Sequence, residues 1–385
     1  MPLSTEDNLR LNVMLANKVD AVRIDEGRML VYGLAADNEM QVQLNPNCRD
    51  ELYIKQVREL LSGHVLGSPG GYPVFLKRWT RMGQMKDDSL ADLLKLGEPE
   101  AVMAVVCAQG LTDELARLAW WAAPEAEHAR RMLESEYVVK GSMGVELSDF
   151  LIEFLPFEED PHAIVRSVRL VLQGNLISDE TRGKLWARGM KKNVYRIGFL
   201  EACPDELPEP VPAREDADTY QSQLQALADK GNALAAHLKK ILSSEGQSFI
   251  HTGTMILKKP TNQESVCALL NAVGKYFDHE YEPVSDDNGE TVSNAMAEQD
   301  IMVLLENARQ AVAIPGSEQQ AILEVFPELK AELVALLTLA SVTDAIATPV
   351  FARTDAVGSV MRKKLVPVTE PLFEQFSNLG QVRGK

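Results

Sequence analysis

A glycine-rich stretch near the start of the chain has the composition of an anion-binding loop. It reads Gly-His-Val-Leu-Gly-Ser-Pro-Gly-Gly-Tyr-Pro from Gly63 to Pro73. Glycines allow several backbone N–H groups to converge on one anion. The residue order is not that of a P-loop or of a Gly-x-Gly-x-x-Gly loop, so a rigid turn between a helix and a strand is the alternative. The candidate ligand or partner residues are Gly67, Ser68, Gly70, Gly71 and Tyr72.

A basic and aromatic cluster follows this loop and could hold an anion. Its candidate residues are Lys77, Arg78, Trp79 and Arg81. At the edge of a strand, such cations would instead protect against pairing with other chains. A third alternative is a regulator that contacts RNA or DNA through Lys77 to Arg81, with an affinity that falls steeply with salt. The formal net charge of −17 opposes phosphate backbones, so we do not expect nucleic acid as a partner.

Cys48 is the candidate thiol. The chain has four cysteines and no C-x-x-C pair, which argues against a zinc ribbon or a thioredoxin-like motif. We expect reduced thiols in a cytoplasm. Cys48 precedes Arg49, and a thiolate near the basic cluster and the Gly63 to Pro73 loop could be activated. A sulfur-handling protein or other enzyme that uses Cys48 is therefore one alternative for the function.

Other catalytic or metal-binding patterns are missing from the sequence. The run Asp278-His279-Glu280-Tyr281-Glu282 lacks the H-E-x-x-H spacing that places two histidines on one helix face. No Gly-x-Ser-x-Gly elbow is present. We therefore predict no metal and no cofactor, and we favour a protein that is not an enzyme.

A basic helix face is the last candidate site. Around Trp186, the apolar residues Met190, Val194 and Ile197 are spaced to share one side of a helix. The opposite side would carry Lys184, Arg188, Lys191, Lys192 and Arg196. Such a face is either solvated surface or a docking site for an acidic protein or for the acidic third region of this chain.

Composition limits the kind of protein that positions these residues. The length of 385 residues exceeds what one core usually supports, and 45% hydrophobic with 25% charged residues is typical of globular proteins. The first residues lack the basic and then apolar order of a signal peptide. The longest apolar stretch, Leu333 to Val342, is too short to span a bilayer. We expect a cytoplasmic protein without a membrane partner.

Strand patterns are confined to the first region. Ala21 to Ile24, Met29 to Tyr32 and Met40 to Leu44 alternate like short strands, and a further strand is expected after Pro73. Asn47 to Asp50 can cap a helix in which Leu52, Val57, Leu60 and Leu61 share a face and which ends at Gly63. The sequence thus predicts a small α+β domain at residues 1–88.

Helical periodicity and an internal repeat follow. Gln109-Gly110-Leu111-Thr112-Asp113-Glu114 resembles Gln173-Gly174-Asn175-Leu176-Ile177-Ser178-Asp179-Glu180, and a tryptophan lies seven residues after each repeated aspartate. Thr112 and Ser178 are natural helix N-caps. HEAT-like repeats or an irregular bundle are expected at 89–203, followed by a proline-rich linker at 204–214.

The third region, 215–385, reads as an acidic helical bundle domain. Steps of four and three run from Tyr220 through Gly231 to Ile241, a spacing that favours an intramolecular bundle helix over a dimerisation zipper. Further helices are expected at 262–277, 294–313 and 317–340. The fold prediction is therefore predominantly α, with a small N-terminal α+β domain, helical repeats or an irregular bundle, and a C-terminal helical domain.

Several short blocks of the first two regions resemble one known family. They are Asn45 to Asp50, Gly67 to Pro73 with Lys77 to Gly83, Gly110 to Arg117 with Trp120-Trp121, and Leu155 to Pro161. These blocks resemble DsrS proteins, accessory proteins of the dissimilatory sulfite reductase gene cluster in sulfur-oxidising bacteria. The resemblance covers roughly residues 1–215, and it implies a cytoplasmic role beside sulfur oxidation but no catalytic residue.

The leading prediction combines both lines of reasoning. Helical faces and an acidic surface suit contact with other proteins. We expect a non-catalytic accessory or regulatory protein whose partners are cytoplasmic proteins, which the resemblance would place in sulfur metabolism.

Overall fold

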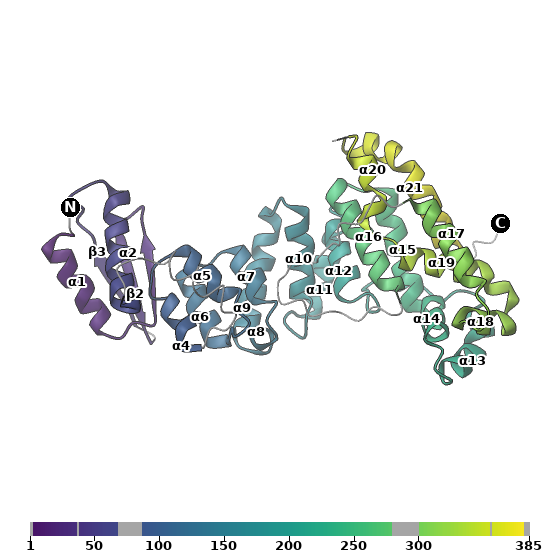
Figure 1. Ribbon diagram of the computed structural model, residues 1–385, viewed down its shortest axis with the longest axis horizontal. Coiled ribbons are helices and arrows are strands. Elements are labelled where there is room, and N and C mark those ends of the chain that lie inside the picture. Colours follow the sequence, from purple (N-terminus) through teal and green to yellow (C-terminus); the bar gives the residue numbers. More distant parts are fainter. Residues whose placement is uncertain (1–2, 37, 68–86, 279–299, 355, 381–385) are drawn as a thin grey trace. The chain divides into compact units, whose positions relative to one another are not determined.

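The structure is a computed structural model that describes residues 3–36, 38–67, 87–278, 300–354 and 356–380. The described chain is predominantly helical and has one small antiparallel sheet near its N-terminus (Figure 1), which confirms the predicted fold class. Its internal contacts divide it into two units, Met1–Phe154 and Leu155–Lys385. The division into domains at residues 88, 203 and 214 stays a prediction.

The first unit begins with a helix, a three-stranded meander and a second helix. These elements are α1 (Thr5–Ala16), β1 (Ala21–Asp25), β2 (Leu30–Ala35), β3 (Asn38–Gln43) and α2 (Asp50–Leu66). The strands pair antiparallel in the order β1-β2-β3. All three predicted strands are therefore confirmed in this part of the chain, while α1 was not expected. The strand predicted after Pro73 lies outside the described residues.

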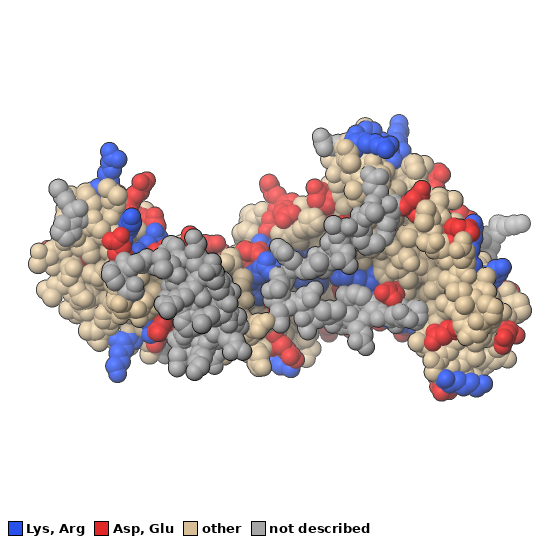
Figure 2. Space-filling model, viewed as in Figure 1, with Lys and Arg blue, Asp and Glu red and all other residues tan. Residues whose placement is uncertain are grey.

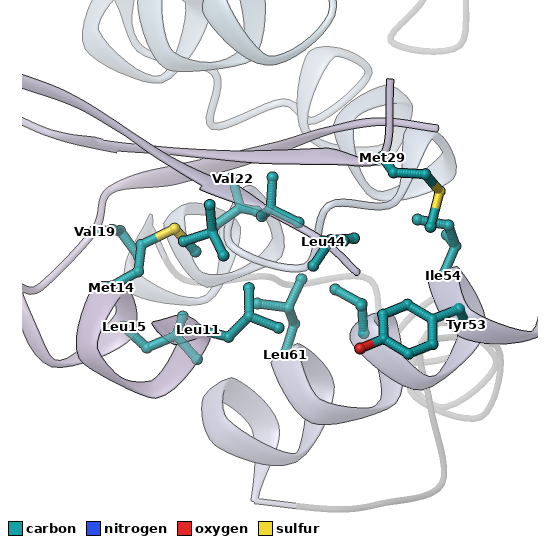
Figure 3. Close-up of a cluster of buried hydrophobic side chains, with 13 residues drawn as sticks. Leu11, Met14, Leu15, Val19, Val22, Met29, Leu44, Tyr53, Ile54 and Leu61 are labelled. Atoms are coloured by element: carbon teal, nitrogen blue, oxygen red, sulfur yellow. The ribbon is translucent and has the colours of Figure 1, made fainter. Parts of the chain in front are cut away.

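The core of this part forms between α1, the sheet and α2. Figure 3 shows Leu11 and Met14 of α1, Val22 of β1, and Tyr53 and Leu61 of α2 pointing toward one another. All five side chains are buried. Burying each of these large aliphatic or aromatic side chains stabilises the fold by about 1.5–3 kcal/mol.

One carboxylate is buried at the margin of this core. Asp7 of α1 has no exposed surface. It accepts a hydrogen bond of 2.5 Å from the Tyr53 hydroxyl and one of 2.7 Å from the backbone N–H of Asn45. Burial alone would raise the pKa of Asp7, but these hydrogen bonds and one with Ser4 hold that pKa below its ordinary value. Asp7 therefore ties α1 to α2 in its ionised form.

Helix α2 differs from its prediction in length and in its buried face. It continues through Gly63 and ends at Leu66, and Gly67 follows with a left-handed φ of 62°. Leu52, expected on the apolar face, is 54% exposed. Tyr53 and Ile54 are buried together with the predicted Val57 and Leu61, and Leu60 packs against the same core, so Leu52 is the one residue of the predicted face that was misplaced.

Six further helices complete the described part of the first unit. They are α4 (Asp87–Leu93), α5 (Pro99–Val106), α6 (Asp113–Ala122), α7 (Ala126–Met132), α8 (Glu136–Lys140) and α9 (Met143–Phe154). Thr112 caps α6 by accepting a hydrogen bond from the N–H of Leu115, as its position predicts. The Asp113 carboxylate accepts bonds from the N–H groups of Ser142 and Met143 at the start of α9.

The second unit is helical throughout its described residues. Its first elements are η1 (Leu155–Phe157), α10 (Pro161–Val171), α11 (Asp179–Arg188), α12 (Val194–Ala202), α13 (Ala217–Ala228), α14 (Ala233–Leu242) and α15 (Ser244–Lys258). They are followed by α16 (Gln263–Phe277), α17 (Ile301–Val312), α18 (Glu318–Val325), η2 (Pro327–Leu329), α19 (Lys330–Ala340), η3 (Asp344–Ile346), α20 (Thr348–Phe351) and α21 (Gly358–Leu379). Ser178 caps α11 and Asn262 caps α16, both through side-chain hydrogen bonds.

Helix α16 lies at the centre of this unit and packs against α10, α12, α15 and α19. Its C-terminal aromatics, Tyr276 and Phe277, contact Phe249 of α15 and Phe376 of α21. The Phe249 and Tyr276 rings stack with centroids 3.8 Å apart. Such aromatic pairs add about 0.5–1.5 kcal/mol each beyond their burial, so α15, α16 and α21 form one aromatic core.

Two predicted helices of the third region are interrupted in the structure. The seam from Tyr220 to Ile241 is two antiparallel neighbours, α13 and α14, because Gly231 turns the chain with a φ of 93°. The helix expected at 317–340 is divided into α18 and α19 at Phe326-Pro327, since proline cannot continue the hydrogen-bond pattern of α18. The predicted helix at 294–313 starts at Ile301 in the described residues.

The segment 204–214 lacks regular structure, yet its side chains are fixed to the helices. Asp205 accepts a hydrogen bond from the Tyr276 hydroxyl and pairs with Lys240. Arg214 has a side chain that is 2% exposed and binds Asp216, Glu332 of α19 and the backbone carbonyl of Asn378 in α21. A segment with proline-rich composition is thus held in place by its charged residues.

Among the described helices, none combines the length and the apolar composition that a bilayer span requires.

Candidate protein-docking surface

The predicted basic helix face is not one helix. Helix α11 ends at Arg188 and α12 begins at Val194, and the N–H groups of Gly189, Met190 and Lys191 bond carbonyls three residues earlier. Such tightened bonds are typical of a helix terminus. Met190, predicted on the buried apolar side, is 71% exposed in this loop. The prediction of a single helix is therefore wrong. The residues at its centre, 189–193, form a loop between α11 and α12.

Two of the five predicted cations are engaged within the second unit. Lys184 pairs with Glu180 one helix turn earlier at 2.6 Å. The Arg196 side chain is only 12% exposed, stacks on the Trp186 ring at 4.6 Å and contacts Glu209 at 3.4 Å. Arg196 therefore supports the packing between α11 and α12, whereas Lys184 stays largely exposed in a surface ion pair.

The other three predicted cations, Arg188, Lys191 and Lys192, are exposed. None of the three forms an ion pair with a carboxylate of the residues that the structure describes. Arg188 lies against Tyr195, where burial raises the pKa of the tyrosine hydroxyl and the guanidinium opposes that rise. Within the described part of the chain, no carboxylate pairs with the positive charges of this loop.

Two more lysines join the loop from a distant part of the sequence. The side-chain amide of Asn193 donates a hydrogen bond of 2.7 Å to the backbone carbonyl of Lys259, the residue that ends α15. Lys258 and Lys259 are exposed. Met255, one turn earlier in α15, is 44% exposed. The contact brings two cations and a methionine beside the loop.

We call this group the basic–methionine surface. Its members are Arg188, Met190, Lys191, Lys192, Met255, Lys258 and Lys259. Lys258 and Lys259 lie at the C-terminus of α15, where the helix dipole favours positive charge. Figure 2 shows acidic and basic side chains interspersed over one face of the molecule. Five cations without carboxylate partners among the described residues thus form a local exception on a chain of net charge −17.

Sequence reasoning found only half of this surface. Arg188, Lys191 and Lys192 follow from the local pattern, but Lys258 and Lys259 lie 66 residues beyond the loop that they join. The one signal in the sequence is the pair Lys258-Lys259 beside Met255 at the end of an apolar helix. Nothing in that pattern says which loop the helix end meets.

The other candidate residues lie elsewhere or outside the described ranges. Gly67 ends α2, whereas Ser68, Gly70, Gly71 and Tyr72 fall outside the described residues. The same holds for the candidate anion patch of Lys77, Arg78, Trp79 and Arg81. These residue predictions stay predictions.

The candidate thiol Cys48 is partly buried against the N-terminal core, and its Sγ lies 3.7 Å from the backbone oxygen of Arg49. The part of Asp278 to Glu282 from His279 onward is not described. Across the described residues, no group of three or more His, Cys, Asp or Glu side chains is arranged to hold a metal ion.

Comparison with known proteins gives no counterpart: no family model, no curated protein and no solved structure matches the chain. The chemistry of the basic–methionine surface is therefore the main guide to function.

Proposed function

We propose that this chain is a non-catalytic accessory protein that binds an acidic segment of another protein at the basic–methionine surface. One observation carries the proposal. Five exposed cations without carboxylate partners in the described structure surround two exposed methionines, on a chain that is otherwise strongly acidic. A partner with clustered Asp and Glu residues would complement that surface.

The two residue types supply different parts of the interaction. Lysines and arginine at a rim raise the association rate and select the charge of the partner. Methionines adapt their flexible thioethers to irregular apolar contacts. Met190 and Met255 would therefore receive apolar side chains of the partner, while Arg188 and the four lysines bind its carboxylates.

The biological setting of this activity is part of the same proposal. Because the blocks Asn45 to Asp50 and Gly110 to Arg117 resemble DsrS proteins, we propose that the acidic partner belongs to cytoplasmic sulfur oxidation beside a reverse-acting sulfite reductase. The resemblance and the surface lie on different residues, so each supports a separate part of the proposal.

Affinity purification with paired charge reversals tests the proposal. The full chain and its Lys191→Glu/Lys192→Glu variant are used to capture proteins from a native extract, and the captured proteins are identified by mass spectrometry. Lys363→Glu/Lys364→Glu is the matched control, because it makes the same charge change on two exposed lysines of α21. The expected result is an acidic partner that the wild type and the control retain.

The affinity of that partner for the first variant should fall by about 10–100-fold, which is the effect of losing or reversing several exposed charge pairs. Equal capture by both double variants would reject the basic–methionine surface. Capture of an acidic partner unrelated to the sulfite reductase cluster would keep the surface and reject the sulfur-oxidation setting.

A further inference from the structure

The outer edge of β1 in the first unit carries backbone groups that pair with no strand of the described residues. The backbone N–H of Val22 bonds the carbonyl of Leu94 at 2.9 Å, so the backbone polar groups of Val22 point away from β2. Residues two apart in a strand have the same orientation, so the backbone N–H and carbonyl of Ile24 also point away from β2. The carbonyl of Val22 and both the N–H and the carbonyl of Ile24 have no hydrogen-bond partner among the described residues.

This edge opens into a cleft of about 490 Å³, a volume within the usual range of binding sites. Its lining includes Ile24, Glu26, Tyr32, Arg58, Glu98 and Glu125. More than nine in ten buried backbone polar groups in proteins are paired. The segment around Leu94 already occupies the outward N–H of Val22, so the groups of Ile24, which have no partner among the described residues, mark the position at the C-terminal end of β1 that an added peptide backbone can complete.

One end of the cleft has an excess of carboxylates. Arg58 of α2 binds Glu26 at 2.7 Å and Glu98 at 3.3 Å, so one cation serves two acids. Burial raises the pKa of Glu98, Arg58 opposes the rise, and Glu100 and Glu26 add to it. Glu125 is exposed and has no ion pair among the described residues. A cation from a ligand would relieve the repulsion between these carboxylates.

Arg23 and Tyr32 also line the cleft, and Trp121 and Glu39 outside it hold Arg23 in place. The Arg23 guanidinium lies 4.6 Å from the Tyr32 ring centroid and 5.0 Å from that of Trp121. Trp121 donates a hydrogen bond of 3.0 Å to Glu39, which also pairs with Arg23 at 3.5 Å. These contacts hold this part of the lining in place before any ligand binds, which reduces the entropy cost of binding.

We propose that an extended segment of a partner protein adds a strand to the outer edge of β1 and directs a lysine or arginine toward Glu98 and Glu125. Unpaired backbone groups with strand spacing select a peptide backbone, and pockets beside the edge select alternate side chains. The carboxylate excess selects the basic residue. This site is separate from the basic–methionine surface, which attracts acidic segments.

A peptide titration of the ¹⁵N-labelled full chain tests the proposal. The probe is an acetylated and amidated six-residue peptide, Thr-Val-Lys-Val-Thr-Val, and its matched control carries glutamate in place of lysine. Binding of the lysine peptide should slow amide hydrogen exchange at Ile24 at least about tenfold, since that N–H becomes a strand hydrogen bond. The glutamate peptide should bind about tenfold more weakly, as expected for one reversed charge contact.

Backbone N-methylation separates strand addition from simple charge attraction. Two further lysine peptides are methylated at alternate backbone nitrogens, one in each register. In strand addition, one register faces β1 and loses binding, while the other faces away and keeps it. Equal affinities of the two registers, equal affinities of the lysine and glutamate peptides, or unchanged exchange at Ile24 would each overturn the proposal.

Substitutions in the cleft test the same contacts from the side of the protein. Glu98→Gln/Glu125→Gln should weaken the lysine peptide about tenfold, while Glu146→Gln, an exposed residue of α9, should leave its affinity unchanged. Ile24→Pro removes the outward N–H at a position where an edge strand tolerates proline, and it should abolish binding with the melting temperature recorded alongside. The N-methylated peptides decide the question if that variant does not fold.

Discussion

The side-chain amide of Asn193 donates a hydrogen bond of 2.7 Å to the backbone carbonyl of Lys259. This bond joins the loop between α11 and α12 to the C-terminal end of α15. A carbonyl at a helix terminus has no partner within its own helix, so Asn193 satisfies a group that would otherwise require water. The bond also sets the spacing between Lys191-Lys192 and Lys258-Lys259.

Asn193→Ala should separate these two pairs of lysines. The expected loss of stability is about 0.5–1.5 kcal/mol, the net value of one hydrogen bond, and amide exchange should accelerate across residues 189–193. Affinity for the acidic partner should also fall, although no charge has changed. Gln225→Ala is the control, because it removes exposed side-chain hydrogen bonds with Asp229 and Lys239, away from the loop. Unchanged exchange in the loop would show that Asn193 does not position it.

Asp7 should make the first unit sensitive to acid. Because its folded pKa lies below the ordinary value of 3.8, the ionised form favours folding. That stability is fully present above the unfolded pKa and is lost as the pH falls through the folded pKa. Asp7→Asn should cost about 1–3 kcal/mol at neutral pH. The difference from wild type should shrink below pH 3.8.

Urea unfolding followed by circular dichroism between pH 3 and pH 7 measures this difference, and each step of one pKa unit corresponds to about 1.4 kcal/mol. Asp149→Asn on the exposed face of α9 is the control and should show no such trend. A stability difference that stayed constant across this pH range would mean that the pKa of Asp7 is the same in the folded and the unfolded state.

Two helical glycines should respond in opposite directions to alanine. A Cβ added at Gly274 in α16 would lie 2.0 Å from the backbone oxygen of Val342, whereas one added at Gly183 in α11 meets nothing within 4 Å. Gly274→Ala should destabilise the second unit by about 1–3 kcal/mol through overpacking. Gly183→Ala should stabilise it by about 0.5–1 kcal/mol through lower chain entropy. Thermal melts measure the change in melting temperature of each variant, which should be negative for Gly274→Ala and positive for Gly183→Ala. Changes of the same sign would contradict the packing described around α16.

Local signals in the sequence predicted local structure well. Thr112 and Ser178 cap the helices that their side chains indicate, because each bond is made within three residues. The alternation in Ala21 to Ile24 gave a strand for the same reason: one face is buried by neighbours close in the chain. On the predicted face of α2, Val57 and Leu61 are buried as expected, but Leu52 was misassigned, since tertiary packing favoured Tyr53 and Ile54.

The candidate sites depend on contacts that no local pattern encodes. The hydrogen bond between Asn193 and Lys259 joins two segments that are far apart in the sequence. The sequence pattern of neither segment predicts this contact. The outer edge of β1 can be identified only from the bond between the N–H of Val22 and the carbonyl of Leu94. That bond shows which backbone groups of β1 point away from β2. A sequence pattern can predict a strand, but the direction of its unpaired groups depends on register.

Arg214 also affects the order in which the second unit can be completed during protein synthesis. Its buried guanidinium binds Glu332 and the carbonyl of Asn378, the latter 164 residues further along. On the ribosome, residues 155–214 emerge long before these acceptors do. Until residue 378 has left the exit tunnel, Arg214 lacks the Asn378 carbonyl, and α15 and α19 are not yet covered by α21.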